Sequence, residues 1–412
     1  MLKTLKSIDL LMLSLMILSL PSLEAPKNIF LVCYLLTRTL IESHKLFRNV
    51  RQWSSWDSLF LIIVFTAFLS TLFAGMPNLE EWKGFRVLLT AILTGWFLSR
   101  TQYTRENYRG LFMLIVLSTL APLAWGLYEY LIIHSRKTLE IHSVGHVNHS
   151  AIYLTMIFGA TLSWFLSQLN FKREKQNLKW QTIFLGILSV VFFVCLIIGE
   201  SRGAFGVATI LSLLIFLLLA KDTKIKIWGG VSIVAIITLA IILKASIIQK
   251  QISNQEANNT LGSRDKVWNV SLEASRFYPL LGIGMSNWHF ISAEQLKKSV
   301  EARGELFNRD NYAFPGHSHN LYLTALVERG IIGLIVTFLF MIAWARHLFH
   351  NFNVTKKSRE AIYLWGGSFS AWVTTFGIGF VNTTFHHEHA ILACLFLGLY
   401  LSYTSVFPNK IN

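Results

Sequence analysis

Twelve long apolar stretches run through this chain, and they constrain its fold more than any other feature. Each holds about 17 to 25 residues, the length at which an α-helix crosses a hydrocarbon core of about 30 Å. With 53% hydrophobic and 14% charged residues over 412 positions, the chain is too apolar for a soluble protein of this length. We therefore predict an all-α integral membrane protein with about 12 transmembrane helices, forming a single polytopic domain over residues 1–412. The predicted spans are 8–24, 26–42, 57–76, 83–99, 110–133, 150–169, 180–199, 203–220, 227–246, 320–345, 361–382 and 388–407.

Lysine and arginine are concentrated in every second connection between these spans. The positive-inside rule places such connections in the cytoplasm, so both termini are predicted to be cytoplasmic. The net charge of +15 is therefore mostly an orientation signal. It does not favour nucleic-acid binding, because the basic clusters are spread over many loops without an aromatic-interleaved face. The basic clusters are Lys45, Arg48, Arg51; Arg100, Arg105, Arg109; Lys172, Arg173, Lys175, Lys179; Lys221, Lys224, Lys226; and Arg346, Lys356, Lys357, Arg359.

One connection on the outer side is much longer than the others. Residues 247–319 separate the ninth and tenth spans, and they contain too many Trp, Phe and Leu residues for a disordered segment. We predict one helix that begins after Ser263 as N-cap and stops near Pro279. A second, amphipathic helix is predicted with Ser292 and Gln295 in capping-box spacing. Its apolar face, predicted to lie on the membrane surface or over a site, is Leu296, Val300 and Leu306.

Two arginines on the outer side have the same local setting. Arg202 follows Ser201 at the start of the eighth span, and Arg264 follows Ser263 at the start of the loop helix. The first turn of a helix favours an anion through its free N–H groups and its dipole, and a guanidinium fork matches phosphate oxygens. We predict that the two arginines bind one phosphorylated ligand, although anchoring in lipid headgroups is an alternative role. Helix starts expected to surround that ligand are Ser150, Arg202 and Asn320.

Histidines are also concentrated on the outer side. Two clusters stand out there, "HSVGHVNH" from His142 to His149 and "HHEH" from His386 to His389. We expect no bound metal, because adjacent histidines at a helix start point in different directions and no Cys or Asp is near. Asn148 and His149 are candidates to contact sugar or phosphate instead. Gly282 and Gly284 are expected to form a structural turn rather than a phosphate-binding loop.

The outer end of the tenth span carries a more specific motif. His319 and Asn320, followed after nine residues by Gly330 and Gly333, give a His-Asn-x9-Gly-x-x-Gly pattern that resembles the O-antigen ligase (WaaL) family. That family lies within the wider superfamily of O-antigen ligases, polymerases and protein O-oligosaccharyltransferases. "GHVNHSAIYL", "SRGA", "GSRDKVW" and "PLLGIGMSNW" are similar to other blocks of the family, in the same order.

This resemblance implies an inverting, metal-independent glycosyltransferase of the transmembrane type, without cofactor, in the inner membrane of a Gram-negative bacterium. Its substrates would be O-antigen polysaccharide linked to undecaprenyl pyrophosphate as donor and the lipid A-core oligosaccharide as acceptor, joined at the periplasmic face. The residue-by-residue match implies that Arg202 and Arg264 bind pyrophosphate and that His319 is the essential histidine. We interpret His319 as the general base, at the cap position of the tenth span, with His317 and Asn320 as substrate-binding neighbours.

Several alternatives remain open at this stage. An O-antigen polymerase would use the same donor with a second lipid-linked glycan as acceptor, and a protein O-oligosaccharyltransferase would use a Ser or Thr. A transporter for lipids or anions is the non-enzyme alternative, but we find no paired inverted halves and no spans broken by Gly or Pro in both halves. The sequence leaves open which of His317 and His319 contacts the acceptor hydroxyl.

Overall fold

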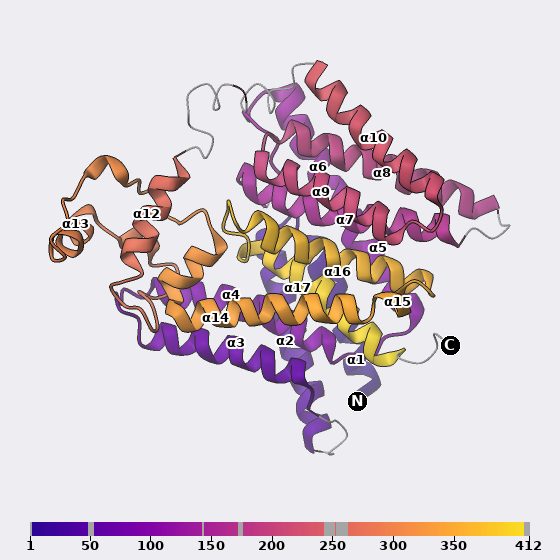
Figure 1. Cartoon of the computed structure of the whole chain (residues 1–412). Helices are drawn as coiled ribbons and strands as arrows, with labels where there is room; N and C mark the ends of the chain where they lie inside the picture. Colours follow the sequence, from indigo (N-terminus) through magenta and orange to yellow (C-terminus); the bar gives the residue numbers. More distant parts are fainter. Residues whose placement is uncertain are drawn as a thin grey trace.

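The computed structural model describes residues 2–47, 53–141, 144–171, 176–242, 252 and 263–407, and it is a helical bundle with no strand among them. The start of α1 and the end of α17 lie on one side of the bundle, and a lobe containing α12 and α13 lies on the opposite side (Figure 1). The helices are α1 (Leu2–Ser19), α2 (Glu24–Phe47), α3 (Ser55–Leu72), α4 (Glu80–Ser99), α5 (Arg105–Ser118), α6 (Leu120–Tyr128), α7 (Val147–Asn170), α8 (Gln176–Ile198), α9 (Arg202–Leu219), α10 (Thr223–Ile242), α12 (Arg264–Ala274), α13 (Ala293–Glu301), α14 (Leu321–His350), α15 (Phe352–Thr355), α16 (Arg359–Ile378) and α17 (His387–Val406).

The chain is a multi-pass membrane protein. Seven helical segments of the described residues are long and apolar enough to cross a membrane: α3, the segment Arg105–Ile133, α7, the segment Trp180–Ile198, α9, α14 and α17. All twelve predicted spans overlap a helix, but several ends differ from the prediction. The fifth span is divided into α5, α6 and a π-helical turn, Glu129–Ile133. The sixth begins at Val147, so the predicted start at Ser150 is wrong and Ser150 lies inside α7.

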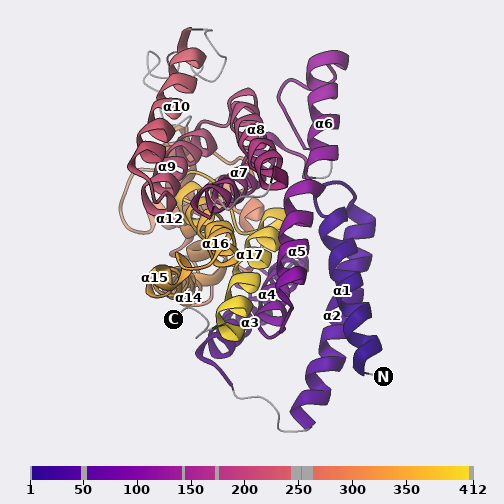
Figure 2. The ribbon, with the colours of Figure 1, turned by 90° about the vertical axis from the view of Figure 1, so that its right-hand side faces the viewer.

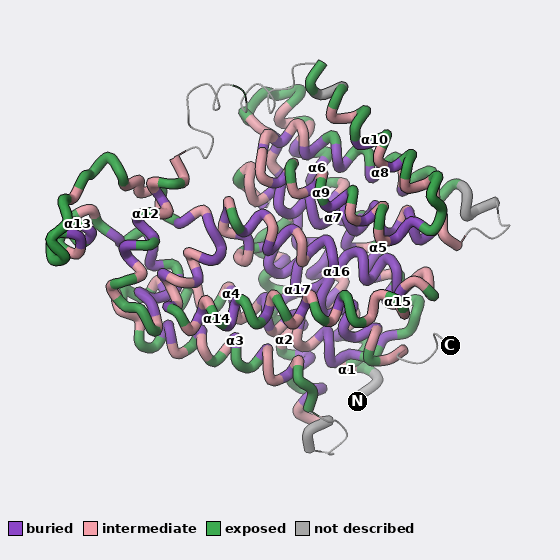
Figure 3. Tube along the Cα trace, in the orientation of Figure 1, coloured by how far each residue is buried: buried purple, intermediate pink, exposed green. Residues whose placement is uncertain are grey.

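The burial pattern is that of a bundle surrounded by lipid. One stripe along α2 consists of exposed apolar side chains, Ile29, Val32, Leu36 and Leu40. Contact of these side chains with water would be unfavourable, whereas contact with lipid hydrocarbon is not. At the other extreme, 94% of the most apolar 18-residue stretch of α7 and 83% of that of α17 are buried inside the bundle. Figure 3 shows the buried trace at the centre of the bundle, and Figure 2 shows α1 and α2 together at one edge with α10 at the other. Residues presented by α7 and α17 are therefore held by the most enclosed part of the fold.

A break in α14 explains the first of the two glycines of the sequence motif, Gly330. Gly330 has φ 65° and ψ −169°, a conformation that only glycine adopts without strain. A segment of turns, residues 279–284, lies against the break and replaces the lost helical hydrogen bonds. Ile331 N donates to Pro279 O at 2.8 Å, and Ile283 N donates to Val327 O at 2.9 Å. The expected turn at Gly282 and Gly284, with φ 78° and 105°, is part of this segment.

Gly330→Ala is expected to destabilise the protein by about 1 to 3 kcal/mol or more, the cost of a disfavoured backbone conformation. A Cβ on residue 330 would also lie 2.2 Å from the carbonyl oxygen of Leu280. The measurement is the thermal unfolding midpoint of the detergent-purified protein. Gly206→Ala in α9 is the matched control, because a Cβ there meets no atom within 4 Å. Equal midpoints for the two variants would contradict the role given to Gly330.

The lobe that contains α12 and α13, here called the outer lobe, has its own small core. Leu296 of α13 packs there with Val270 of α12 and Trp288. Val300 of α13 is also buried, so this apolar face is turned into the lobe and not toward a membrane surface. The capping box of Ser292 and Gln295 is confirmed.

One detail of the predicted loop was wrong. Leu306 is 98% exposed and lies beyond the end of α13, outside its apolar face. Ser263 is the N-cap residue of α12, as predicted, but its φ of 61° is left-handed and its side chain makes no capping hydrogen bond. The part of the predicted 247–319 loop before residue 263 lies outside the described residues, apart from residue 252.

Candidate active site between two cavities

Five helix starts meet at the end of the bundle that faces the outer lobe. The first residues of α7, α9 and α12, which are Val147, Arg202 and Arg264, line one cavity. The first residues of α14 and α17, which are Leu321 and His387, line a second cavity. Each start directs the positive end of a helix dipole toward the cavities. The end of the bundle is therefore suited to negatively charged ligands.

The first cavity, here called the arginine cavity, has a volume of about 290 Å³. Asn148, Arg202 and Arg264 all line it, as does one carboxylate, Glu200. Ser201 Oγ donates a hydrogen bond to Asn148 Oδ1 at 3.0 Å, which connects the start of α9 to α7. Burial, and after it the charge of Arg202, lowers the pKa of Arg264. Two guanidinium groups close enough to repel one another can be brought together favourably by an anion between them.

The second cavity, here called the histidine cavity, is larger, at about 540 Å³. His149, His317, His386 and His387 line it, and the ring centroids of His149 and His386 are 4.8 Å apart. Three further residues of its lining are basic, Lys83, Arg86 and Arg329, and one is acidic, Glu328. Five predicted site residues are thus divided between two spaces, whereas His319 and Asn320 line neither. His142, at the start of the predicted histidine cluster, lies outside the described residues.

His319 lies between the two cavities. Its ring centroid is 4.0 Å from that of His317, which lines the histidine cavity. It also shares a side-chain hydrogen bond with Asn382, which lines the arginine cavity. Nδ1 of His319 is buried and has no hydrogen-bond partner among the described residues. An imidazole with one nitrogen oriented by an amide and the other available is arranged to accept a proton.

The backbone around His319 is held tightly. His319 has φ 49°, a left-handed conformation that is uncommon for a residue other than glycine and occurs often at functional sites. The next residue, Asn320, is the N-cap of α14, so the prediction that His319 is the cap was wrong by one position. Asn320 Oδ1 accepts hydrogen bonds from Tyr322 N and Leu323 N, at 2.9 and 3.0 Å.

Asn320 also connects two segments of the site. Its Nδ2 donates to Phe380 O at 2.9 Å, and Leu321 N donates to Gly379 O at 2.8 Å. These bonds fix the start of α14 to the connection between α16 and α17, which contains Asn382. They also occupy the side chain of Asn320, so direct contact with a substrate would require some of them to break. The arrangement fixes the backbone next to His319.

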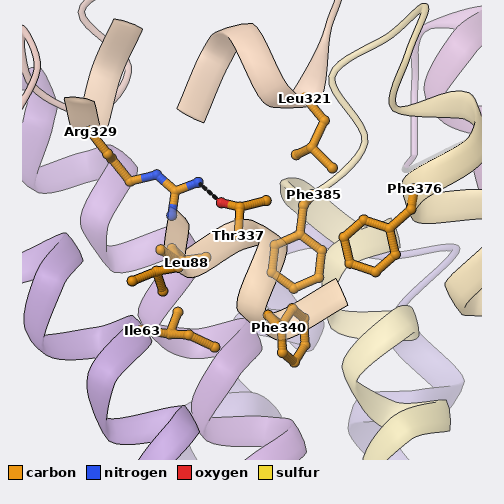
Figure 4. A pocket seen from close by; sticks show the side chains of 9 residues that line it. Ile63, Leu88, Leu321, Arg329, Thr337, Phe340, Phe376 and Phe385 are labelled. Atoms are coloured by element: carbon orange, nitrogen blue, oxygen red, sulfur yellow. Dashed lines mark hydrogen bonds between the residues drawn. The ribbon is translucent and has the colours of Figure 1, made fainter. Parts of the chain in front are cut away.

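Sequence reasoning missed several residues of the two cavities. Asn382 lies in the connection between α16 and α17, outside every motif singled out in the sequence, and only the fold brings it to His319. Arg86, Glu328 and Arg329 had a usable signal, because ionisable residues inside apolar spans are functional candidates by default. Arg329 Nη2 donates to Thr337 Oγ1 at 3.1 Å above a small apolar space that Phe385 helps to line (Figure 4).

The pH dependence of a reaction that uses His319 as base can be predicted from its environment. Burial, followed by the positive charges of His317 and Arg264, lowers the pKa of His319 to about 4. A lowered pKa means that the proton leaves at lower pH, so His319 is already neutral between pH 5 and 8. We expect kcat/KM, which reports the free enzyme, to be flat over about pH 5 to 8 and to fall only near pH 4. A half-maximal value near the ordinary histidine pKa of about 6.5 would contradict this assignment.

The region that contains these residues is similar to a known protein family. Residues 187–338 match the Wzy_C family model, described as O-antigen ligase. The matched segment includes Arg202, Arg264, His317 and His319, and its last residues contain the break in α14. The chain also aligns with an uncharacterized protein of Haemophilus influenzae (strain ATCC 51907 / DSM 11121 / KW20 / Rd), with 26% identity over 180 residues. That alignment covers 41% of this chain and 43% of the relative, which is less than half of either.

Proposed function

We propose that this chain, whose residues 187–338 match the O-antigen ligase family model, transfers an O-antigen polysaccharide from undecaprenyl pyrophosphate to the lipid A-core oligosaccharide. The transfer takes place at the periplasmic face of the inner membrane. The observation that carries the proposal is the pairing of Arg202 and Arg264 in one cavity, with His319 at its boundary. The arginine cavity receives the pyrophosphate of the donor, and His319 serves the acceptor.

The chemistry divides between these groups according to charge. The acceptor hydroxyl oxygen attacks the anomeric carbon while the bond from that carbon to the pyrophosphate oxygen breaks. Pyrophosphate leaves with the bonding electrons as an anion, so it needs cations more than a proton, and Arg202 and Arg264 supply them. The hydroxyl proton passes to the free nitrogen of neutral His319. Attack opposite the leaving group inverts the configuration of the anomeric carbon.

The proposed membrane topology has twelve spans with both termini in the cytoplasm and the outer lobe in the periplasm. It is supported by the alternation of basic connections and by the position of α12 and α13 opposite the chain ends (Figure 1). Reporter fusions after Lys175 and Lys357 should give a cytoplasmic signal, and a fusion within residues 255–259 should give a periplasmic one. A cytoplasmic signal from residues 255–259 would place the two cavities on the wrong side for this reaction.

Analysis of the lipopolysaccharide of a deletion strain tests the function. A ligase is indicated if all capped polymer is lost while lipid-linked polymer accumulates. A core that carries a single repeat unit would indicate a polymerase instead. Loss of a glycosylated protein, with normal lipopolysaccharide, would indicate a protein O-oligosaccharyltransferase. Transfer by the purified protein from a lipid-linked donor to the core acceptor excludes the transporter alternative, and it should persist in the presence of a metal chelator.

A further inference from the structure

We propose that the histidine cavity binds the acceptor glycan and selects it through an anionic substituent on a sugar, either phosphate or carboxylate. This inference rests on the proposed function, because it assigns the second substrate of that reaction to a cavity. It requires the acceptor to carry an anionic substituent, a requirement that the residues of the sequence motif do not indicate. The residues that carry the requirement are Lys83 and Arg86.

The first argument is the position of the cavity. The wall between the two cavities is formed by pairs of neighbouring residues that face opposite spaces. Asn148 and Asn382 line the arginine cavity, whereas His149 and Thr383 line the histidine cavity. His319 belongs to this wall. A base within such a wall can take a proton from a hydroxyl on one side while the donor is bound on the other.

The second argument is the charge of the histidine cavity. Three basic side chains and one carboxylic acid line it. Glu328 interacts electrostatically with Arg329 and accepts hydrogen bonds from the backbone N–H groups of Ser286 and Trp288, which leaves Lys83 and Arg86. Arg86 is exposed and has no ion pair with any described residue. Lys83, one turn earlier on α4, has its Nζ 2.6 Å from Glu80 Oε1, in an exposed pair that a ligand could replace. The cavity therefore has positive charge left for a ligand.

The third argument is the mixture of lining groups. Ser286, Thr324 and Thr383 provide hydroxyls to the same cavity, and the imidazoles of His149, His289 and His317 provide flat, hydrogen-bonding surfaces. Hydroxyls and rings of this kind suit the hydroxyl groups and faces of sugars. A ligand consisting of a bare phosphate would leave much of the roughly 540 Å³ unused. A sugar that carries an anionic substituent would contact both the basic side chains and the hydroxyl and imidazole groups of the lining.

The experiment compares Arg86→Gln with wild type in transfer assays that vary donor and acceptor separately. The acceptors are purified lipid A-core oligosaccharide, the same material after removal of its phosphates, and the same material after reduction of its carboxylates. Loss of one charged hydrogen bond predicts an increase in KM for the intact acceptor of about tenfold. The KM for the donor should not change. The matched control is Lys298→Gln on α13, whose exposed side chain lies outside both cavities.

The treated acceptors identify the anion. The treatment that removes the relevant group should raise the wild-type KM by a similar factor, and Arg86→Gln should then add no further increase. An acceptor KM that is unchanged in Arg86→Gln would overturn the inference. It would also be overturned if Arg86→Gln raised the KM equally for intact acceptor and for both treated acceptors, or if the variant raised the donor KM instead. Binding of the intact and treated acceptors is measured separately in the absence of donor. Absence of transfer with acceptor binding that still depends on Arg86 would reject the proposed function alone, whereas binding that does not depend on Arg86 would reject this inference.

Discussion

Replacement of His319 with alanine is expected to lower kcat for glycan transfer by about 10²- to 10⁴-fold, the usual contribution of a general base. Donor binding should persist, because Arg202 and Arg264 line the arginine cavity and keep their charges. The measurement is in vitro transfer with saturating lipid-linked donor and core acceptor, together with donor binding by the same preparation. Thermal unfolding of the variant confirms that the protein is folded.

His317→Ala is the matched comparison for that variant. The two rings are neighbours, with centroids 4.0 Å apart, but only His319 shares a hydrogen bond with Asn382. We therefore expect a milder loss for His317→Ala, mainly in acceptor KM, because His317 lines the histidine cavity. Retained transfer in His319→Ala, or a larger loss in His317→Ala, would reverse the assignment of the base.

Arg202→Lys and Arg264→Lys are each expected to lower kcat/KM by about 10- to 100-fold at normal protein level. Lysine keeps the positive charge but loses the planar fork that binds two phosphate oxygens at once. The loss should be larger in the double variant, and it should appear in donor KM as well as kcat, since pyrophosphate is bound before and during bond breakage.

Arg276→Lys provides the control for the arginine variants. Arg276 lies in the outer lobe, is largely exposed, and pairs with Glu273 at 3.6 Å, away from both cavities. Its replacement should leave donor KM unchanged. Wild-type transfer by both Arg202→Lys and Arg264→Lys would rule out bidentate binding of the pyrophosphate.

The helices were predictable because hydrophobic length is a local property of the sequence. The apolar stretches located the bundle, and Ser292 with Gln295 located a helix start within the outer loop. Helix ends were less accurate, as at Val147, because polar residues such as Asn148 and His149 can begin a helix when its end faces a cavity. The two arginines could be expected to bind an anion because their positions in a first helical turn are also local.

The arrangement of the site depended on contacts that no local pattern contains. Asn382 reaches His319 from a connection more than 60 residues away, because Asn320 and Leu321 fix the start of α14 to that connection. Division of the predicted residues between two cavities likewise depends on helix packing. Glycine is common in transmembrane helices, so Gly330 and Gly333 within an apolar run did not reveal a break.

The break at Gly330 also affects how the protein is made. Residues 279–284 leave the ribosome before α14 does, yet α14 needs their carbonyl and N–H groups to complete its own hydrogen bonds. Backbone groups left unbonded in hydrocarbon cost several kcal/mol each. Insertion of α14 and docking of this segment are therefore coupled during biogenesis. A chimera that exchanges the outer loop between relatives should accumulate in the membrane only when the α14 that matches it is exchanged as well.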